Sequence, residues 1–147
     1  MRVLLMRHGD AVDSRTAPEP LRHLTPLGRD QVRKVASELR RRGYALTHAY
    51  ASPLVRAVQS AELLCAELRF AGPIPVHPHL VPEGTTARAL SVLDLHADQD
   101  FVALVTHEPI VRAMASHLTG SAIPGFTTAG VAIVELPAGA LVDQLTP

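Results

Sequence analysis

Basic and imidazole side chains follow two strongly apolar segments of the sequence. The first segment, residues 2–7, leads into Arg7 and His8, and the second, residues 101–105, is soon followed by His107. Each short, continuous apolar run predicts a strand that is buried on both faces of a sheet. Because ligands of open α/β sheets bind at the carboxyl ends of the strands, we expect Arg7, His8 and His107 to share one crevice.

Arg56 adds a second guanidinium to this set. It lies in the first turn of a helix that we expect to begin at Ser52-Pro53, with Ser52 as its cap. A positive charge is unfavourable at the amino end of a helix, so Arg56 is expected to face an anion. A guanidinium matches phosphate oxygens, and helix amides add further donors. No cluster of carboxylates or cysteines suggests a catalytic metal, so we expect phosphate chemistry without a metal or cofactor.

The elements that position these side chains alternate between strands and helices. We expect strands at 2–7, 46–51 and 101–105, and a proline-broken strand at 73–79 that is irregular or lies at an edge. We also expect helices starting at 25–26, 52–53, 85–86 and 109, and a hairpin of 130–136 with 140–145. This order predicts an α/β fold with three layers, namely a doubly wound, mostly parallel sheet with an antiparallel C-terminal hairpin. The length predicts one domain, 1–147.

Residues 10–24 form a long polar loop in this scheme, and such loops are often functional or mobile. Arg22 and His23 near its end are candidates for the rim of the pocket. Gly9 is expected to allow a sharp turn before the loop. The first helix should be capped by Thr25 and should stop at Gly43.

The composition excludes several classes of partner. The chain has 14 basic and 14 acidic residues, which gives no reason to expect nucleic acid or an anionic membrane as a partner. No apolar run approaches the roughly 20 residues of a membrane span, and no signal peptide is visible. We therefore expect a soluble, cytoplasmic monomer. The lone Cys65 is expected to be a buried hydrophobe.

Six histidines fall outside the predicted crevice. His77 and His79 share a face of the proline-containing segment 73–79, but without a third ligand we interpret them as surface residues. The other four are expected to be solvated or to cap helices: His23, His48, His96 and His117.

Four blocks of the sequence resemble, in the same order, the histidine phosphatase superfamily with its phosphoglycerate mutase-like fold. They are LLMRHGD, LTPLGRDQ, ASPLVRAVQSAELL and VTHEP, and the match extends over nearly the whole chain. The length resembles the SixA-type phosphohistidine phosphatases. The resemblance implies that His8 attacks phosphorus and is transiently phosphorylated, while Arg7, Arg56 and His107 hold the phosphoryl oxygens. Water then releases inorganic phosphate, without a cofactor.

The expected charges agree with these roles. A nucleophilic imidazole must be neutral, and the neighbouring Arg7 and Arg56 should lower the pKa of His8. A positively charged His107 would help the arginines to stabilise the negative charge of the phosphoryl group. Glu108 is interpreted first as a helix cap and only second as a catalytic acid.

The sequence departs from larger members of the family at the general acid. Many of them carry Glu or Asp at the position that Pro82 occupies here, which leaves Glu83 and Asp10 as candidate acids. An imidazole leaving group needs less protonation than an alkoxide, so Pro82 favours phosphohistidine over sugar phosphates. The chain is too short for a helical cap over the pocket. An open pocket would admit a phosphohistidine-bearing protein, and the SixA resemblance implies a histidine-phosphotransfer domain.

Two other functions stay open. A small-molecule phosphomonoesterase on the same scaffold would use Glu83 or Asp10 as its acid. A phosphate- or phosphoprotein-binding module without turnover is disfavoured, because binding alone would not require a histidine in the position of His8. A mutase is less expected, because it needs an enclosed site.

Overall fold

Five strands form one sheet in the order β2-β3-β1-β4-β5 in the computed structural model, which describes residues 1–147. The strands are β1 (Arg2–Arg7), β2 (His48–Ala51), β3 (Phe101–Thr106), β4 (Val131–Glu135) and β5 (Ala140–Leu145). β1, β2 and β3 are parallel, whereas β4 runs antiparallel to β1 and β5 antiparallel to β4. The expected mostly parallel sheet with an antiparallel C-terminal hairpin is therefore confirmed.

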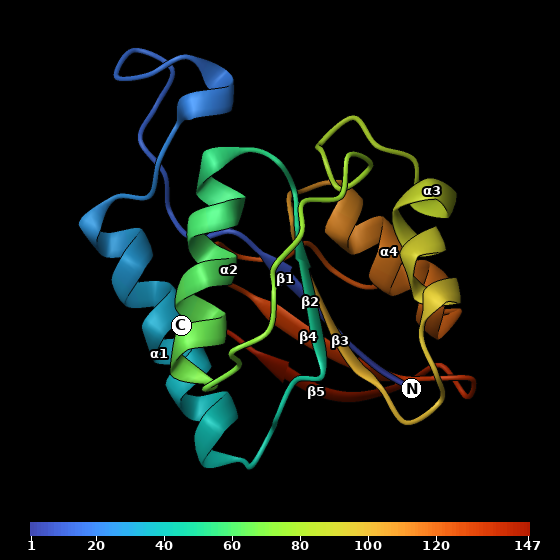
Figure 1. Ribbon diagram of the computed structural model, residues 1–147. Coiled ribbons are helices and arrows are strands. Elements are labelled where there is room, and N and C mark those ends of the chain that lie inside the picture. The colour runs from blue at the N-terminus through green and yellow to red at the C-terminus, as the bar shows by residue number, and fades with distance from the viewer.

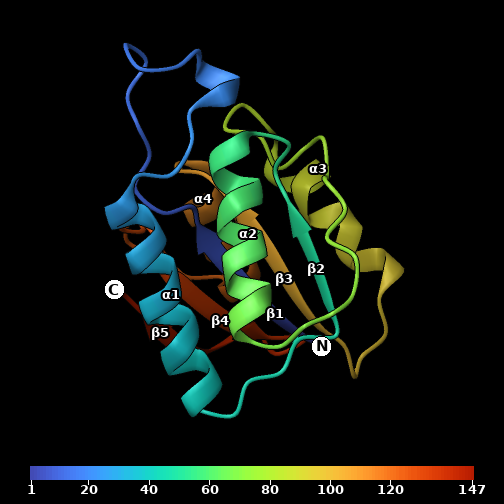
Figure 2. The same cartoon turned by 60° about the vertical axis from the view of Figure 1, so that its left-hand side comes forward.

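Helices cover both faces of the sheet, which gives the expected three layers (Figures 1 and 2). The helices are α1 (Pro26–Arg41), α2 (Val55–Glu67), α3 (Thr86–Leu90) and α4 (Ile110–Thr119), with 3-10 turns η1 (Glu19–Leu21) and η2 (Ser91–Leu95). α1 and α2 cover one face, and α3, η2 and α4 cover the other. None of these helices has the length and apolar character needed to cross a membrane.

β1 is apolar throughout its centre because the sheet has a helical layer on each side. Leu4 and Met6 pack toward α1 and α2, whereas Val3 and Leu5 pack toward α4, and all four are fully buried. Successive side chains of a strand point to opposite faces, so a strand covered on both faces needs a continuous apolar run. The same rule explains the six buried residues of β3.

The start of α1 is built from local signals. Thr25 Oγ1 accepts a hydrogen bond from the Gly28 amide at 3.0 Å, and Gly43 ends the helix region with a φ of +84°. Gly28 has a second role, because a Cβ at this position would collide with the Asp10 carbonyl oxygen. Gly9 also lies too close for a side chain, since its Cβ would be 2.6 Å from the Gly28 carbonyl oxygen. Close approach of these two segments, more than a sharp turn, explains the glycine at position 9.

Three of the expected elements differ from the structure. Residues 73–79 do not form a strand and contribute only one parallel bridge, from Val76 to Ala51, because prolines remove the amides that a ladder needs. The helix after Thr85 is α-helical only to Leu90 and continues as η2. α2 begins at Val55, so Ser52 does not cap it, although its hydroxyl does accept a weaker bond from the Leu54 amide at 3.3 Å.

Candidate active site

The predicted site residues meet at the carboxyl end of the parallel strands. His8 directly follows β1, and its amide donates to the Thr106 carbonyl of β3 at 3.0 Å. This bond brings His8 beside His107, and their ring centroids are 5.0 Å apart. Arg56 reaches the same point from the first turn of α2 and donates to His8. Sequence reasoning therefore identified side chains that do lie together.

His8 is held as a neutral imidazole with a defined orientation. Its Nδ1 lies 2.7 Å from the Gly9 carbonyl oxygen, which can only accept, so Nδ1 carries the hydrogen. Nε2 is then unprotonated, and the Arg56 Nε–H donates to it at 3.3 Å. Burial, together with the charges of Arg56 and Arg7, lowers the pKa of His8 to about 4, and the sequence predicted this direction for the two arginines. Near neutral pH, Nε2 therefore presents a lone pair.

The Arg56 guanidinium forms an ion pair with the carboxylate of Glu19, which lies in the long loop after β1. Its side chain is only 4% exposed, and it donates to Glu19 twice, to the carbonyl oxygen at 2.9 Å and to Oε1 at 2.7 Å. Arg22 binds the other carboxylate oxygen of Glu19 at 2.9 Å. Hydrogen bonding to Arg22 and the charge of Arg56 lower the pKa of Glu19. The loop thus extends over the amino end of α2, where Figures 1 and 2 show it above the sheet.

Arg7 and His107 each retain a buried polar atom without a protein partner. Arg7 donates from Nη1 to the Phe126 carbonyl at 2.8 Å, but its Nε makes no hydrogen bond. His107 Nε2 lies 2.7 Å from Ser52 Oγ, while its Nδ1 is unpaired. An unsatisfied buried polar group costs about 1–3 kcal/mol. These atoms therefore have hydrogen-bonding capacity for a ligand in the crevice.

The surroundings of His107 favour a neutral ring in the ligand-free protein, whereas the expected positive charge concerned the complex with a phosphoryl group and stays a prediction. Burial, together with the nearby His8 and Arg56, lowers the pKa of His107 to about 2. A cation at this position would be desolvated beside other positive groups. His107 can still donate one hydrogen bond through its single N–H.

The carboxylates considered as acids have different surroundings. Asp10 accepts a hydrogen bond from Thr25 Oγ1 at 2.6 Å, so it supports the start of α1. Glu83 is exposed and makes no hydrogen bond or ion pair; burial lowers the pKa of Arg56, and the charge of Glu83 only slightly opposes this shift. Glu108 accepts from the Phe126 amide at 2.8 Å instead of capping α4, which corrects the first interpretation. Because Phe126 binds Arg7, Glu108 helps to fix the loop that holds this arginine.

Comparison with known proteins agrees with this arrangement. Residues 3–81 match the family described as the histidine phosphatase superfamily (branch 1). The chain belongs to the histidine phosphatase superfamily. It is 31% identical over 139 residues to phosphohistidine phosphatase SixA of Escherichia coli strain K12, covering 92% of this chain and 86% of that protein.

Solved structures of histidine phosphatases have the same fold. The protein histidine phosphatase SixA complexed with tungstate superposes with a TM-score of 0.90 at 30% identity, covering 100% of this chain and 97% of that one. A candidate SixA from Agrobacterium tumefaciens gives 0.85 at 24% identity, with 99% and 98% covered, and this second likeness concerns the fold alone. The expected phosphoglycerate mutase-like, SixA-type architecture is thus confirmed.

Three residues of this histidine phosphatase site were missed by sequence reasoning. Glu19 lies in a loop without periodicity, so no spacing links it to Arg56. Ser52 was assigned to a helix cap, yet it contacts His107. Ser60 accepts from the Gly9 amide at 3.0 Å and donates to the Arg56 carbonyl at 2.7 Å. A serine four residues after Arg56 on a buried helix face was the one available signal for it.

Proposed function

We propose that this histidine phosphatase removes phosphate from a phosphohistidine-bearing protein through a covalent phospho-His8 intermediate. The observation that carries the proposal is the pair of contacts on the His8 ring. The Gly9 carbonyl holds the hydrogen on Nδ1, and Nε2 keeps its lone pair because the pKa of His8 is about 4. The 31% identity to SixA supports the choice of phosphohistidine as substrate.

Arg7, Arg56 and His107 are proposed to bind the phosphoryl oxygens. Arg7 Nε and His107 Nδ1 lack protein partners, and the Arg56 donors become available when the incoming phosphoryl group replaces Glu19. Fixed donors are most effective when they surround the oxygens on which charge accumulates during transfer. The tungstate in the SixA structure is an oxyanion and is consistent with such a site.

Two displacements complete the proposed reaction. His8 Nε2 forms a bond to phosphorus as the P–N bond of the substrate breaks, and the departing imidazole leaves neutral when its other nitrogen carries a hydrogen. Water then attacks phospho-His8, the bond from Nε2 to phosphorus breaks, and the water proton leaves with inorganic phosphate. Nε2 recovers its lone pair, and every group in these steps comes from the chain, the substrate or water.

A protein substrate is proposed because the site offers no well-placed proton donor. Pro82 stands where larger relatives have an acid, and Asp10 is bound to Thr25. A neutral imidazole can leave without that donor, whereas an alkoxide gains much from it. We further propose that residues 1–147 act as one monomeric domain and that the partner resembles a histidine-phosphotransfer domain.

A small-molecule phosphomonoesterase is the second candidate, and one observation favours it. Glu83 is exposed, makes no hydrogen bond, and lies close enough for its charge to oppose slightly the lowering of the Arg56 pKa by burial. A carboxylate in such a place has the freedom to protonate an alkoxide leaving group.

The test compares phosphate release from a phosphohistidine-bearing protein with release from a panel of sugar phosphates. We expect faster turnover of phosphohistidine, loss of all turnover in His8→Ala, and little change in Glu83→Gln. Faster turnover of a sugar phosphate, with a sharp decrease in Glu83→Gln, would replace the proposal with the second candidate. Binding by both wild type and His8→Ala without any hydrolysis would indicate a binding module.

A further inference from the structure

A second group of polar side chains lies at the other end of the parallel strands, away from His8. His48 begins β2, Asp100 immediately precedes β3, and His96 follows η2. Asp100 Oδ2 is 3.4 Å from His96 Nδ1 and 3.8 Å from His48 Nδ1, and the two imidazole rings are 4.2 Å apart. The side chain of His96 is only 5% exposed, so of the two roles expected from the sequence, solvated or capping, it has the second, because it caps η2.

These distances fit the first coordination sphere of a small divalent cation. The three ligand atoms all lie within 4.8 Å of one another. Zinc binds nitrogen and oxygen ligands at about 2.0–2.2 Å, and tetrahedral geometry then separates ligand atoms by about 3.3–3.5 Å. The separations of 3.4 and 3.8 Å from Asp100 are therefore close to those that a bound ion would require.

The surroundings orient two of the three ligands. His96 Nε2 is 2.9 Å from the Tyr50 hydroxyl, which leaves Nδ1 directed at Asp100. Histidine ligands of metals generally use the second ring nitrogen in this way. Asp100 Oδ2 also accepts from the Ala97 amide at 3.0 Å, which fixes the carboxylate. The third ligand, His48 Nδ1, contacts Thr47 Oγ1 at 2.9 Å, a hydroxyl that also bonds the Phe101 carbonyl at 3.2 Å. If His48 Nδ1 turned to bind an ion, the Thr47 hydroxyl would therefore keep its hydrogen bond to the Phe101 carbonyl.

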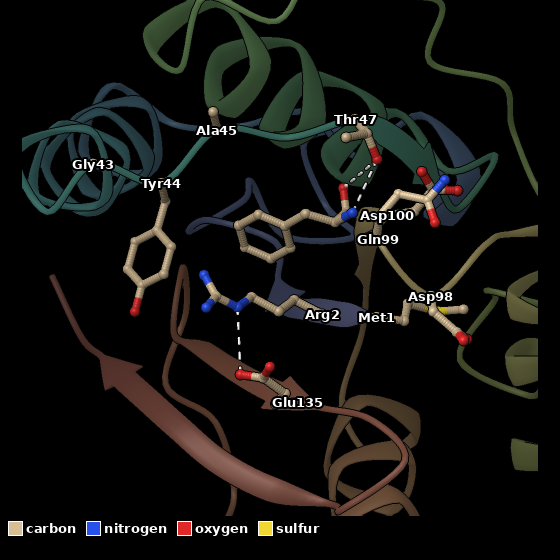
Figure 3. A pocket seen from close by; sticks show the side chains of 11 residues that line it. Met1, Arg2, Gly43, Tyr44, Ala45, Thr47, Asp98, Gln99, Asp100 and Glu135 are labelled. Atoms are coloured by element: carbon tan, nitrogen blue, oxygen red, sulfur yellow. Dashed lines mark hydrogen bonds and ion pairs between the residues drawn. The ribbon is translucent and has the colours of Figure 1, made fainter.

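A cavity gives solvent access to this group. Thr47 and Asp100 line a hollow of about 420 Å³ together with Asp98, Arg2 and Glu135, as Figure 3 shows. His48 itself is 44% exposed on the side chain. Of the three ligands, Asp100 is open to this hollow and His48 to solvent, so an ion can approach the group past these two residues, and a water molecule can fill a fourth coordination position.

We propose that His48, His96 and Asp100 bind a divalent transition-metal ion such as Zn²⁺, with one coordination position open to water. The ion would join the start of β2 to the connection between η2 and β3. Because the unfolded chain does not hold these ligands together, binding would stabilise the folded state. The site is separate from the proposed phosphatase chemistry, which uses no metal.

Zinc titration by calorimetry and thermal unfolding with and without Zn²⁺ test the proposal in the metal-free full-length protein. We expect one equivalent to bind to wild type and to raise its Tm. His48→Ala removes a half-exposed ligand, and Asp100→Asn removes the charge but keeps an acceptor for the Ala97 amide. Each should weaken binding by about tenfold or more and abolish the rise in Tm.

The double variant His77→Ala/His79→Ala is the matched control. These two rings are also close, at 5.5 Å, but no carboxylate accompanies them, so zinc affinity should be unchanged. Binding of Co²⁺ to wild type should give the visible absorption of a tetrahedral site, and His48→Ala should lose it. Absence of saturable Zn²⁺ binding, or equal affinity in His48→Ala, Asp100→Asn and wild type, would overturn the proposal. None of these measurements depends on the phosphatase activity.

Discussion

Two hydrogen bonds of opposite sense define the His8 imidazole. The ring donates from Nδ1 to the Gly9 carbonyl and accepts at Nε2 from Arg56. The first bond fixes the tautomer and the ring plane. The second keeps the lone pair directed toward the guanidinium where we propose that the phosphoryl oxygens bind.

The first prediction concerns the pH dependence of catalysis. Burial with the charges of Arg56 and Arg7 lowers the pKa of His8 to about 4, so the imidazole is protonated only below that pH. We expect kcat/KM for a phosphohistidine substrate, corrected for titration of the substrate, to keep its value as the pH falls from 7 to about 5. A decline with an apparent pKa near the ordinary histidine value of about 6.5 would contradict this prediction.

The second prediction concerns Glu19, which holds the Arg56 donors in the ligand-free state. Glu19→Gln should lower the inhibition constant of inorganic phosphate by about two- to fivefold, since a partly exposed ion pair contributes about 0.2–1 kcal/mol. Competitive inhibition measures this constant directly. Glu83→Gln is the matched control, because it removes a nearby negative charge that makes no ion pair. An equal decrease in both variants, or none in Glu19→Gln, would show that Glu19 does not compete with phosphate.

At the scale of elements, local signals predicted the framework well. Thr25 and Gly43 delimit α1 as expected, and the apolar runs gave β1 and β3. Helix caps depend on residues that are neighbours in the chain, and buried strands depend on runs of apolar residues, so both can be recognised in a sequence. Most of the site could therefore be predicted, because His8 and His107 each follow the carboxyl end of a predicted strand.

The contacts that the sequence did not predict join segments that are distant along the chain. Glu19 meets Arg56 across 37 positions, and Ser52 meets His107 across 55. The first pair forms where the loop after β1 meets α2, and the second forms because β2 pairs with β3. The prolines of segment 73–79 predicted an irregular or edge strand, and the structure retains only one bridge beside the edge strand β2.

The third prediction concerns the contact between α1 and the segment after β1. Gly28→Ala would place a methyl group against the Asp10 carbonyl, so α1 or the segment carrying His8 must move. We expect a loss of about 1–3 kcal/mol in the free energy of unfolding, together with reduced kcat. Urea unfolding and initial rates measure the two effects. Gly125→Ala, where a Cβ meets open space, should leave stability nearly unchanged, and equal losses in both variants would refute the explanation.

At the scale of the molecule, two neutral histidines are buried at the end of the sheet. Burial lowers the pKa of His8 to about 4 and that of His107 to about 2. The unfolded chain binds protons at these groups from about pH 6.5 downward, whereas the folded chain does not. Their contribution to stability is therefore complete above pH 6.5 and is lost as the pH falls toward 4.

The fourth prediction follows from this linkage. The free energy of unfolding, measured with urea, should decrease between pH 7 and pH 5 by about 1–3 kcal/mol. Glu38, whose pKa its bonds to Arg41 and Arg42 lower to about 2, keeps its charge throughout this interval. His8→Gln should reduce the slope because it removes one titrating group. A pH-independent free energy in the wild type would contradict the prediction.

Because Glu19 forms an ion pair with Arg56, its carboxylate competes with any anion that binds at the phosphate site that we propose. A tethered group acts at a fixed effective concentration, which is often millimolar for a short flexible link. This effective concentration sets a threshold, because an anion displaces Glu19 only when its concentration is high enough relative to its dissociation constant. In the reaction that we propose, a phosphoryl group delivered by a docked protein would exceed the threshold, because docking raises its local concentration. After hydrolysis, free phosphate would lose that advantage, and the return of Glu19 to Arg56 would speed its release.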